Sequence, residues 1–187
     1  MQRKPGHARQ LRSLPSIISP MGELAGSERA RAPNPVSRVG RADREPGASL
    51  LVAMTIELEE LYADLPGSLQ SVPVTPDEMA PPHGSFVILS ALANGSALAC
   101  GGVRRLADGL CEIKRMYVVP EARGLGLGRR LLDALEDEAR RLGYARVRLD
   151  TGPRQAAARS IYEGAGYRRI PDYNANAYAE FWFEKAL

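Results

Sequence analysis

Three glycines at alternating positions separate a run typical of a β-strand from a run typical of an amphipathic helix. They belong to the segment Arg123-Gly124-Leu125-Gly126-Leu127-Gly128, which follows the strand-like residues 110–119 and opens a helix expected over residues 128–142. Glycine lets a backbone turn tightly and approach a bulky group closely. The first N–H groups of a helix have no intrahelical partner, and the helix dipole adds partial positive charge there. The segment therefore favours an anion site suited to a pyrophosphate.

Other glycine-rich loops also bind phosphate, and their patterns differ from this one. A P-loop needs Gly-Lys followed by Ser or Thr, whereas Arg129 and Arg130 follow Gly128. A dinucleotide-binding loop needs G-x-G-x-x-G within a βαβ unit, whereas the spacing here is G-x-G-x-G. Taken alone, the loop leaves one alternative open, a glycine-rich turn without a ligand.

The chain from residue 34 onward alternates between strand and helix patterns. Strands are expected over residues 36–39, 85–92, 96–105, 110–119, 145–150, 167–170 and 180–185. The turns Asn94-Gly95 and Asp108-Gly109 make three of these strands antiparallel. Helices are expected over residues 49–65, 128–142 and 155–163, and one helical turn is expected after Thr75. This order predicts an α/β domain around a mixed sheet.

The first helix is expected to begin at an N-cap, Ser49, and to end at Pro66-Gly67. Apolar residues recur in it at intervals of three and four, which places them on one face of a helix. The expected buried face consists of Leu51, Met54, Leu58, Leu61 and Leu65.

Composition excludes several classes of protein. A chain of 187 residues with 44% hydrophobic and 25% charged residues is typical of one globular domain. No apolar run approaches the roughly 18 residues of a membrane span, so no membrane partner is expected. Cys100 and Cys111 lack metal-ligand spacing and are expected as buried thiols in a reducing cytoplasm. His7 and His83 lie in no ligand motif, so no metal site is expected.

The formal net charge of +3 is concentrated near the N-terminus. Residues 1–33 contain six basic and two acidic side chains, so the basicity does not indicate a nucleic-acid-binding face on the domain. This segment mixes Pro, Gly, Ser and Arg without a period, and we expect a disordered basic extension before a folded domain over residues 34–187. The sequence leaves two explanations open for this extension. One is an organellar transit peptide, and the other is translation from an upstream start codon, with Met21 as an internal start.

Two segments together resemble the GNAT superfamily of N-acetyltransferases. Residues 112–128, EIKRMYVVPEARGLGLG, resemble its central strand and acetyl-CoA loop, whose signature is Gln/Arg-x-x-Gly-x-Gly/Ala. Arg123, Gly126 and Gly128 occupy the signature positions. Residues 158–167 resemble the family's Ala-x-x-x-Tyr-x-x-x-Gly-Phe/Tyr segment. The similarity covers residues 35–187 and is strongest from Gly101 to Ile170.

This resemblance implies the GNAT fold, a mixed and mostly antiparallel sheet splayed in the middle and flanked by helices. The sheet would open after a bulge near Tyr117 and Val118, and the co-substrate acetyl-CoA would lie in the gap. Backbone groups of Met116 and Val118 would bind the pantetheine arm, and N–H groups from Gly124 to Arg129 would bind the pyrophosphate. The implied binding residues are Met116, Tyr117, Val118, Arg123, Gly124, Leu125, Gly126, Leu127, Gly128, Arg129 and Gln155. Gln155 stands where many relatives have asparagine, which puts its contact in doubt.

Acetyl transfer to an amine needs a base, because an amine with a pKa near about 10.4 is protonated at neutral pH. The resemblance implies Glu112 as that base, and pairing with Lys114 or with an arginine on a neighbouring strand is an equal alternative. It also implies Tyr162 as the general acid for the CoA thiolate, with a packing role as the alternative.

Since no cysteine is placed as an acyl-carrying nucleophile, direct attack of the amine on acetyl-CoA in a ternary complex is favoured over a ping-pong route. On the acceptor side, Asp150, Tyr173 and Trp182 are weaker candidates. Each of the three has a structural role as its alternative.

The predicted function is therefore transfer of an acetyl group from acetyl-CoA to a primary amine by a cytoplasmic monomer or homodimer. No nucleic-acid partner is expected. Two alternatives remain: a non-catalytic acyl-CoA sensor or partner module, and acetylation of protein N-termini or lysines. The acceptor-facing parts are the first helix with its loop over residues 66–83 and the loop over residues 171–177, and neither contains a charge cluster matched to one substrate.

Overall fold

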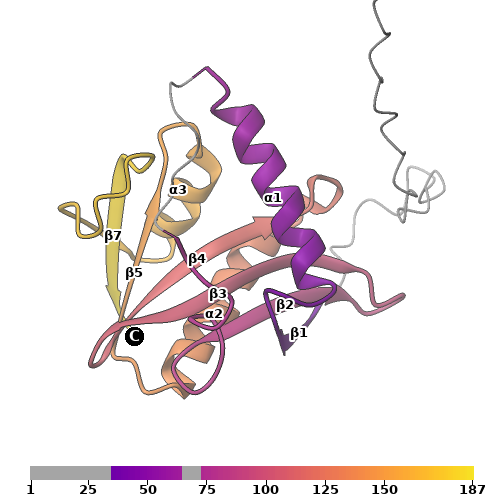
Figure 1. The fold of residues 1–187 in the computed structure, drawn as a ribbon, viewed down its shortest axis with the longest axis horizontal. Coiled ribbons are helices and arrows are strands. Elements are labelled where there is room, and N and C mark those ends of the chain that lie inside the picture. The colour runs from indigo at the N-terminus through magenta and orange to yellow at the C-terminus, as the bar shows by residue number, and fades with distance from the viewer. Residues whose placement is uncertain (1–34, 65–72) are drawn as a thin grey trace, which may run out of the picture. The chain divides into compact units, whose positions relative to one another are not determined.

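A computed structural model describes residues 35–64 and 73–187, and Figure 1 shows their fold. The predicted extension over residues 1–33 and the predicted helix stop at Pro66-Gly67 lie outside the described residues. The helix that was predicted to run to Leu65 nevertheless ends earlier, at Leu61 with Tyr62 as its C-cap, so its predicted end was wrong. The strands are β1 (Pro35–Gly40), β2 (Ser85–Ala91), β3 (Ala97–Ala107), β4 (Leu110–Val118), β5 (Arg146–Thr151), β6 (Arg168–Ile170) and β7 (Phe181–Ala186). The helices are α1 (Gly47–Leu61), α2 (Leu127–Arg141) and α3 (Ala156–Gly164), with a short 3-10 turn at Pro120–Ala122.

The strands form one seven-stranded sheet in the order β1-β2-β3-β4-β5-β7-β6. Only the central β4–β5 pair is parallel, so the predicted mixed, mostly antiparallel sheet is confirmed. Pairing between β4 and β5 covers three positions and ends at Glu112 and Arg148. Both strands continue past these residues, and Figure 1 shows them close at one end and apart at the other. The predicted splay is therefore present.

A bulge interrupts β4 just after the splay begins. The register with β3 shifts between Cys100 and Gly102, so Arg115 and Met116 together stand opposite Gly101. Arg115 has a φ of 60°, a left-handed conformation that costs a residue with a side chain about 1–2 kcal/mol. The bulge predicted near Tyr117 and Val118 is therefore present, about two residues earlier in the strand.

Gly101 explains the position of this bulge. A Cβ at Gly101 would lie 2.7 Å from Leu135 and 3.3 Å from Met116, so the glycine leaves room for Met116 to turn toward α2.

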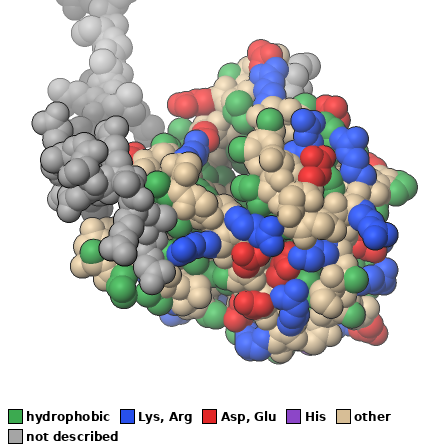
Figure 2. Space-filling model, turned by 180° about the vertical axis from the view of Figure 1, so that it is seen from behind, with side chains coloured by type: hydrophobic (Ala, Val, Ile, Leu, Met, Phe, Trp, Pro, Cys, Tyr) green, Lys and Arg blue, Asp and Glu red, His purple; other side chains and the backbone are tan. Residues whose placement is uncertain are grey.

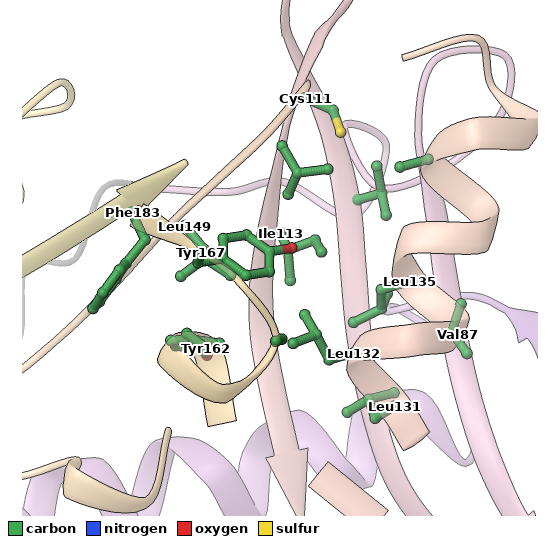
Figure 3. Packing of buried hydrophobic residues seen from close by; sticks show 14 of the residues in the cluster. Val87, Cys111, Ile113, Leu131, Leu132, Leu135, Leu149, Tyr162, Tyr167 and Phe183 are labelled. Carbon is green, nitrogen blue, oxygen red and sulfur yellow. The ribbon is translucent and has the colours of Figure 1, made fainter. Parts of the chain in front are cut away.

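Helix α2 covers one face of the sheet with a fully buried stripe. Leu131, Leu132 and Leu135 contact the sheet side chains, as Figure 3 shows beside Ile113 and Leu149. Arginine and acidic side chains alternate on the outer face of the helix as ion pairs three and four residues apart. Basic and acidic side chains are likewise intermixed on the side of the molecule seen in Figure 2.

Helix α1 packs on the opposite face, and its start differs from the prediction. The helix begins at Gly47 after Pro46, without a side-chain cap, and the Ser49 hydroxyl donates to Glu45 instead. Ser49 is therefore not the N-cap. A Cβ at Gly47 would lie 2.2 Å from the Arg41 carbonyl oxygen, so tight tertiary packing decides where the helix begins.

The buried face of α1 is also rotated from the predicted one. Leu50 and Met54 are buried, whereas Leu51 and Leu58 are partly exposed and Leu61 is exposed. Elsewhere the predicted strands and helices are confirmed to within about two residues. No helix among the described residues has the length and apolar character needed to cross a bilayer.

Candidate functional site

A groove of about 800 Å³ runs between α1, the splayed ends of β4 and β5, the glycine loop and α3. A volume of this size lies within the usual range of about 300–1,000 Å³ for small-molecule sites. Of the predicted catalytic and CoA-binding residues, all line this groove except Glu112 and Leu125, and of the weaker acceptor-side candidates Asp150 lines it while Tyr173 and Trp182 do not. The predicted catalytic and CoA-binding residues that line it are Met116, Tyr117, Val118, Arg123, Gly124, Gly126, Leu127, Gly128, Arg129, Gln155 and Tyr162.

The three loop glycines serve two different purposes. Gly124 and Gly126 have φ values of 75° and 76°, which glycine adopts without steric cost. Gly128 is helical, and a Cβ there would lie 2.7 Å from the Ile161 side chain, so it allows α3 to approach closely. The loop turns at its first two glycines and packs against α3 at the third.

The start of α2 directs backbone N–H groups into the groove. Arg130 donates the first backbone bond of the helix, at 3.2 Å to the Gly126 carbonyl oxygen. The amides of Leu127, Gly128 and Arg129 precede this bond and so have no intrahelical acceptor. All three residues line the groove. The loop can therefore bind an anion with its backbone.

The arginine side chains of the loop brace it. Arg123 donates to the Val118 carbonyl oxygen at 3.0 Å and to Glu57 at 2.6 Å, and its guanidinium lies 5.7 Å from the centre of the Tyr117 ring. Arg129 donates to Asp133 at 2.8 Å and to the Gly164 carbonyl oxygen at 3.2 Å. The first arginine joins the loop to β4 and α1, and the second joins α2 to the end of α3.

Tyr162 lies deep in the groove beside the bulge. Its ring centre is 6.0 Å from that of Tyr167 and 6.0 Å from that of Phe183, and Figure 3 shows the three rings in the core. Its hydroxyl donates to the Met116 sulfur at 3.7 Å. Burial raises the pKa of the Tyr162 phenol above its ordinary value, so the hydroxyl stays protonated and available as a donor.

Glu112 is fully buried and its carboxylate is surrounded by donors. One oxygen accepts from Arg104 at 2.6 Å, and the other accepts from Tyr173 at 2.6 Å and from Asn174 at 3.1 Å, with the Lys114 ammonium 3.3 Å away. The alternative considered from the sequence, pairing with Lys114 or with an arginine on a neighbouring strand, is what the structure shows. Arg104 stands opposite Glu112 on β3.

Asp150, in contrast, lines the groove near the end of β5. Its Oδ2 accepts from Lys114 at 2.6 Å and from Asn174 at 2.5 Å, and its Oδ1 accepts from Asn176 at 3.2 Å. Trp182 donates to Asn174 at 3.0 Å, so it braces the loop between β6 and β7 that carries both asparagines. Neither Asn174 nor Asn176 was predicted, although the Asn-x-Asn spacing in that loop is visible in the sequence.

Arg154 and Gln155 line the groove after β5 and make different contacts. Arg154 donates to the Leu61 carbonyl oxygen at 2.7 Å and to both oxygens of Asp64, at 2.5 and 2.8 Å. The Gln155 side-chain oxygen accepts from the Gly152 amide at 2.9 Å and from Thr151 at 3.1 Å, so it closes the turn after β5. No local sequence pattern pointed to the Arg154 contact, because its partners lie about ninety residues away.

Cysteine and metal chemistry have no support in this groove. Cys100 and Cys111 are buried as predicted, and burial raises the pKa of each thiol to about 12. Both thiols are therefore protonated at neutral pH and poorly nucleophilic. Within residues 35–64 and 73–187, no group of three His, Cys, Asp or Glu side chains could hold a metal ion.

The model of the acetyltransferase (GNAT) family matches residues 53–167, a span that contains the bulge, the glycine loop and α3. The chain belongs to the GNAT family. An IAA acetyltransferase of Azospirillum brasilense is 33% identical to this GNAT protein over 127 residues, which is 67% of this chain and 82% of the relative.

Solved structures show the same GNAT fold. A Klebsiella pneumoniae protein described as an acyl-CoA N-acyltransferase has a TM-score of 0.65 at 26% identity, over 82% of this chain and 98% of its own. A Bacillus subtilis acetyltransferase solved in complex with CoA has a TM-score of 0.57 at 14% identity, over 82% of this chain and 99% of its own.

Proposed function

We propose that this GNAT protein transfers an acetyl group from acetyl-CoA to a primary amine by direct attack in a ternary complex. The observation that carries the proposal is the continuous groove that joins the splay between β4 and β5 to the start of α2. A long acyl donor with an anionic end fits such a groove, because the splayed strands can hold its uncharged arm while the start of α2 holds its anionic group. The CoA complex of the Bacillus subtilis relative supports a CoA-derived donor.

The glycine loop would hold the pyrophosphate of the donor. Its backbone N–H groups and the dipole of the 15-residue α2 favour negative charge at this point. The pantetheine arm would lie along Met116 and Val118, because β5 no longer pairs with β4 there. Backbone groups that have left a sheet need other hydrogen-bond partners, and the amides of the arm can supply them.

Tyr162 would stabilise the departing thiolate. The amine nitrogen attacks the thioester carbon, the C–S bond breaks, and the sulfur leaves with the electron pair. Because burial raises the pKa of Tyr162, its phenol donates a hydrogen bond to the sulfur more readily than it gives up the proton. The tyrosine then acts mainly by stabilising charge, and the thiolate is finally protonated from solvent.

We assign the proton acceptor to Asp150, in place of the predicted Glu112. Asp150 lines the groove, and its Oδ1 accepts a hydrogen bond from Asn176. Glu112 is fully buried, and Arg104, Tyr173, Asn174 and Lys114 contact both of its oxygens. Glu112 then acts as a positioning residue, because it holds Lys114 and Asn174, which in turn hold Asp150.

A thiol-release assay tests the proposal. The protein is incubated with acetyl-CoA and a panel of small amines, amino acids, and peptides that carry either a free N-terminus or lysine. We expect saturable thiol release with at least one small amine. Peptide-only turnover would favour protein acetylation. Tight acetyl-CoA binding by calorimetry without thiol release on any acceptor would favour a sensor, and would refute the enzymatic proposal.

A further inference from the structure

Tyr62, at the end of α1, carries a buried hydroxyl that lacks a hydrogen-bond partner. The residue is 5% exposed and lines the groove. Its hydroxyl oxygen has no hydrogen-bond partner within residues 35–64 and 73–187. Most buried polar groups in proteins are paired, because an unpaired one lowers stability. An unpaired hydroxyl in the wall of a groove is therefore a candidate contact for a ligand.

Packing fixes where this hydroxyl lies. A Cβ at Gly152 would lie 2.1 Å from the Tyr62 hydroxyl oxygen and 2.9 Å from the Tyr178 carbonyl oxygen, so only glycine leaves room for both. The Arg154 guanidinium lies 5.5 Å from the centre of the Tyr62 ring, and the centre of the Tyr178 ring lies 6.3 Å from it. The hydroxyl thus lies where a side chain at position 152 would otherwise be.

Gly152 relates the Tyr62 hydroxyl to Asp150. Val147 and Leu149 of β5 are buried in the core beneath α2, so alternate residues of this strand face the side of α1. Gly152 directly follows β5, two positions after Asp150, and residues two apart on a strand lie on the same face about 6.6 Å from each other. Both residues line the groove. One ligand of modest size can therefore contact the Asp150 carboxylate and the Tyr62 hydroxyl together.

The Tyr62 hydroxyl is a hydrogen-bond donor in neutral surroundings. Burial raises the pKa of the Tyr62 phenol above its ordinary value, and the nearby Arg154 offsets only part of that rise, so the hydroxyl stays protonated at neutral pH. Its ligand partner must then be an acceptor atom.

The charges on this side of the groove disfavour an anionic partner for that hydroxyl. Arg154 is paired with both oxygens of Asp64. Two further carboxylates act on this region, since Glu180 raises the pKa of Tyr62 and Asp150 lines the groove. An additional carboxylate would be repelled here, so an uncharged oxygen is favoured.

The wall that leads to the hydroxyl is apolar. Met54, Leu58 and Tyr62 follow one another at intervals of four along α1, which places them on one face of the helix, and all three line the groove. An aliphatic group on the ligand would bury apolar area against this face.

We propose that the Tyr62 hydroxyl determines acceptor specificity by donating a hydrogen bond, and that the acceptor is an apolar amine with an uncharged oxygen close to its nitrogen. An α-amino amide and a 1,2-amino alcohol both have this chemistry. The amine would face Asp150, and the oxygen would accept from Tyr62. This inference rests on the proposed function and adds the substrate class. Binding would give the hydroxyl the partner that it lacks in the free protein.

Matched acceptors test the inference. L-Leucinamide, L-leucinol and 4-methylpentan-2-amine share an amine and an isobutyl group, and carry an amide, an alcohol and a methyl group respectively beside the amine-bearing carbon. L-Leucine has a carboxylate at that position. Because the four amines differ in pKa, kcat/KM is expressed per unprotonated amine. We expect it to be about 5- to 100-fold higher for L-leucinamide, L-leucinol or both than for 4-methylpentan-2-amine, and lower for L-leucine than for L-leucinamide.

Tyr62→Phe should remove this preference. It should lower kcat/KM for the preferred oxygen-bearing acceptor by about the same factor, and leave kcat/KM for 4-methylpentan-2-amine and the affinity for acetyl-CoA unchanged. The melting temperature should stay the same or rise, because the variant lacks an unpaired buried hydroxyl. Tyr167→Phe is the matched control, since Tyr167 also has a buried hydroxyl without a partner in the described part of the chain but does not line the groove. That variant should keep the acceptor preference.

Four results would overturn the inference and leave the proposed function standing. They are equal turnover of the four acceptors by the unmodified protein, turnover of L-leucine at or above that of L-leucinamide, an equal loss on every acceptor in Tyr62→Phe, and no loss on any acceptor in that variant. If Tyr62→Phe fails to fold, the order of the four acceptors with the unmodified protein decides.

If no acceptor releases thiol, the proposed function fails and the inference is decided separately. Calorimetry then measures binding of L-leucinamide, L-leucinol and 4-methylpentan-2-amine to the CoA-saturated protein. Binding of an oxygen-bearing amine that weakens in Tyr62→Phe would support the inference, whereas no binding or unchanged binding would overturn it.

Discussion

Replacing Tyr162 with phenylalanine removes one hydroxyl from the groove and leaves the ring in place. The ring packs between Tyr167 and Phe183 in the core, and phenylalanine preserves those contacts. In the free protein the hydroxyl donates to the Met116 sulfur at 3.7 Å, and a thioether is a weak acceptor. The free energy of unfolding should therefore change by less than about 1 kcal/mol.

The effect on catalysis should be much larger, because the thiolate forms only as the C–S bond breaks. A hydrogen bond to a charged group contributes about 1.5–3 kcal/mol. Since about 1.4 kcal/mol corresponds to a factor of ten, kcat should fall about 10- to 150-fold in Tyr162→Phe. The dissociation constant of acetyl-CoA should stay within about twofold, because the unreacted thioester sulfur carries no full charge.

The assay follows free thiol at saturating acceptor, beside calorimetry with acetyl-CoA. Tyr167→Phe is the control, because Tyr167 contacts the Tyr162 ring in the same core but does not line the groove. A raised pKa means that Tyr162 stays protonated to higher pH, so its ionisation should not lower kcat below about pH 10. Unchanged kcat in Tyr162→Phe, or an equal fall in both variants, would refute a role for the hydroxyl.

Two further predictions separate the donor side from the acceptor side. Gly126 has a φ of 76°, so Gly126→Ala should lower the free energy of unfolding by about 1–2 kcal/mol, and it should weaken acetyl-CoA binding at least tenfold. The control is Gly109→Ala, at a φ of 66° in the β3–β4 turn, which should cost similar stability and leave the calorimetric affinity for acetyl-CoA unchanged. Equal affinities in the two variants would contradict the anion site. Asp150→Asn should lower kcat about 10²- to 10⁴-fold at neutral pH, with recovery near pH 10 as the amine loses its own proton. A pH–rate profile with the same loss at every pH would make Asp150 a positioning residue.

The order of strands and helices could be predicted because its signals are local. Short apolar runs and the Asn94-Gly95 and Asp108-Gly109 turns between them define the hairpins of β2, β3 and β4 within a few residues of chain. The stripe of α2 is so regular that its predicted and observed limits differ by one residue at each end. Local signals of this strength leave little for distant contacts to change.

Local signals failed where packing decided the outcome. Ser49 is a residue type that is favoured at N-caps, but Gly47 fits against the turn before α1 and the helix begins there. The bulge depends on pairing across two strands, because Gly101 on β3 makes room for Met116 on β4. A Cβ at Gly47 would also lie 2.9 Å from the Phe86 ring, and neither Phe86 nor the partner strand of the bulge lies in a window of neighbouring residues.

By itself, the sequence predicted the glycine loop and the position of Tyr162 in this GNAT protein. The glycine loop combines its turn and its N–H donors within six consecutive residues, and Tyr162 follows at a recognisable spacing. Only the tertiary structure decided how the ionisable side chains of β4 and β5 are placed. Glu112 became a buried ion-pair partner because Arg104 stands opposite it, and Asp150 and Arg115 came to share one groove because β4 and β5 separate there. Burial and charge pairing depend on which strands are neighbours in the sheet, and the spacing of residue types along the sequence does not contain that information.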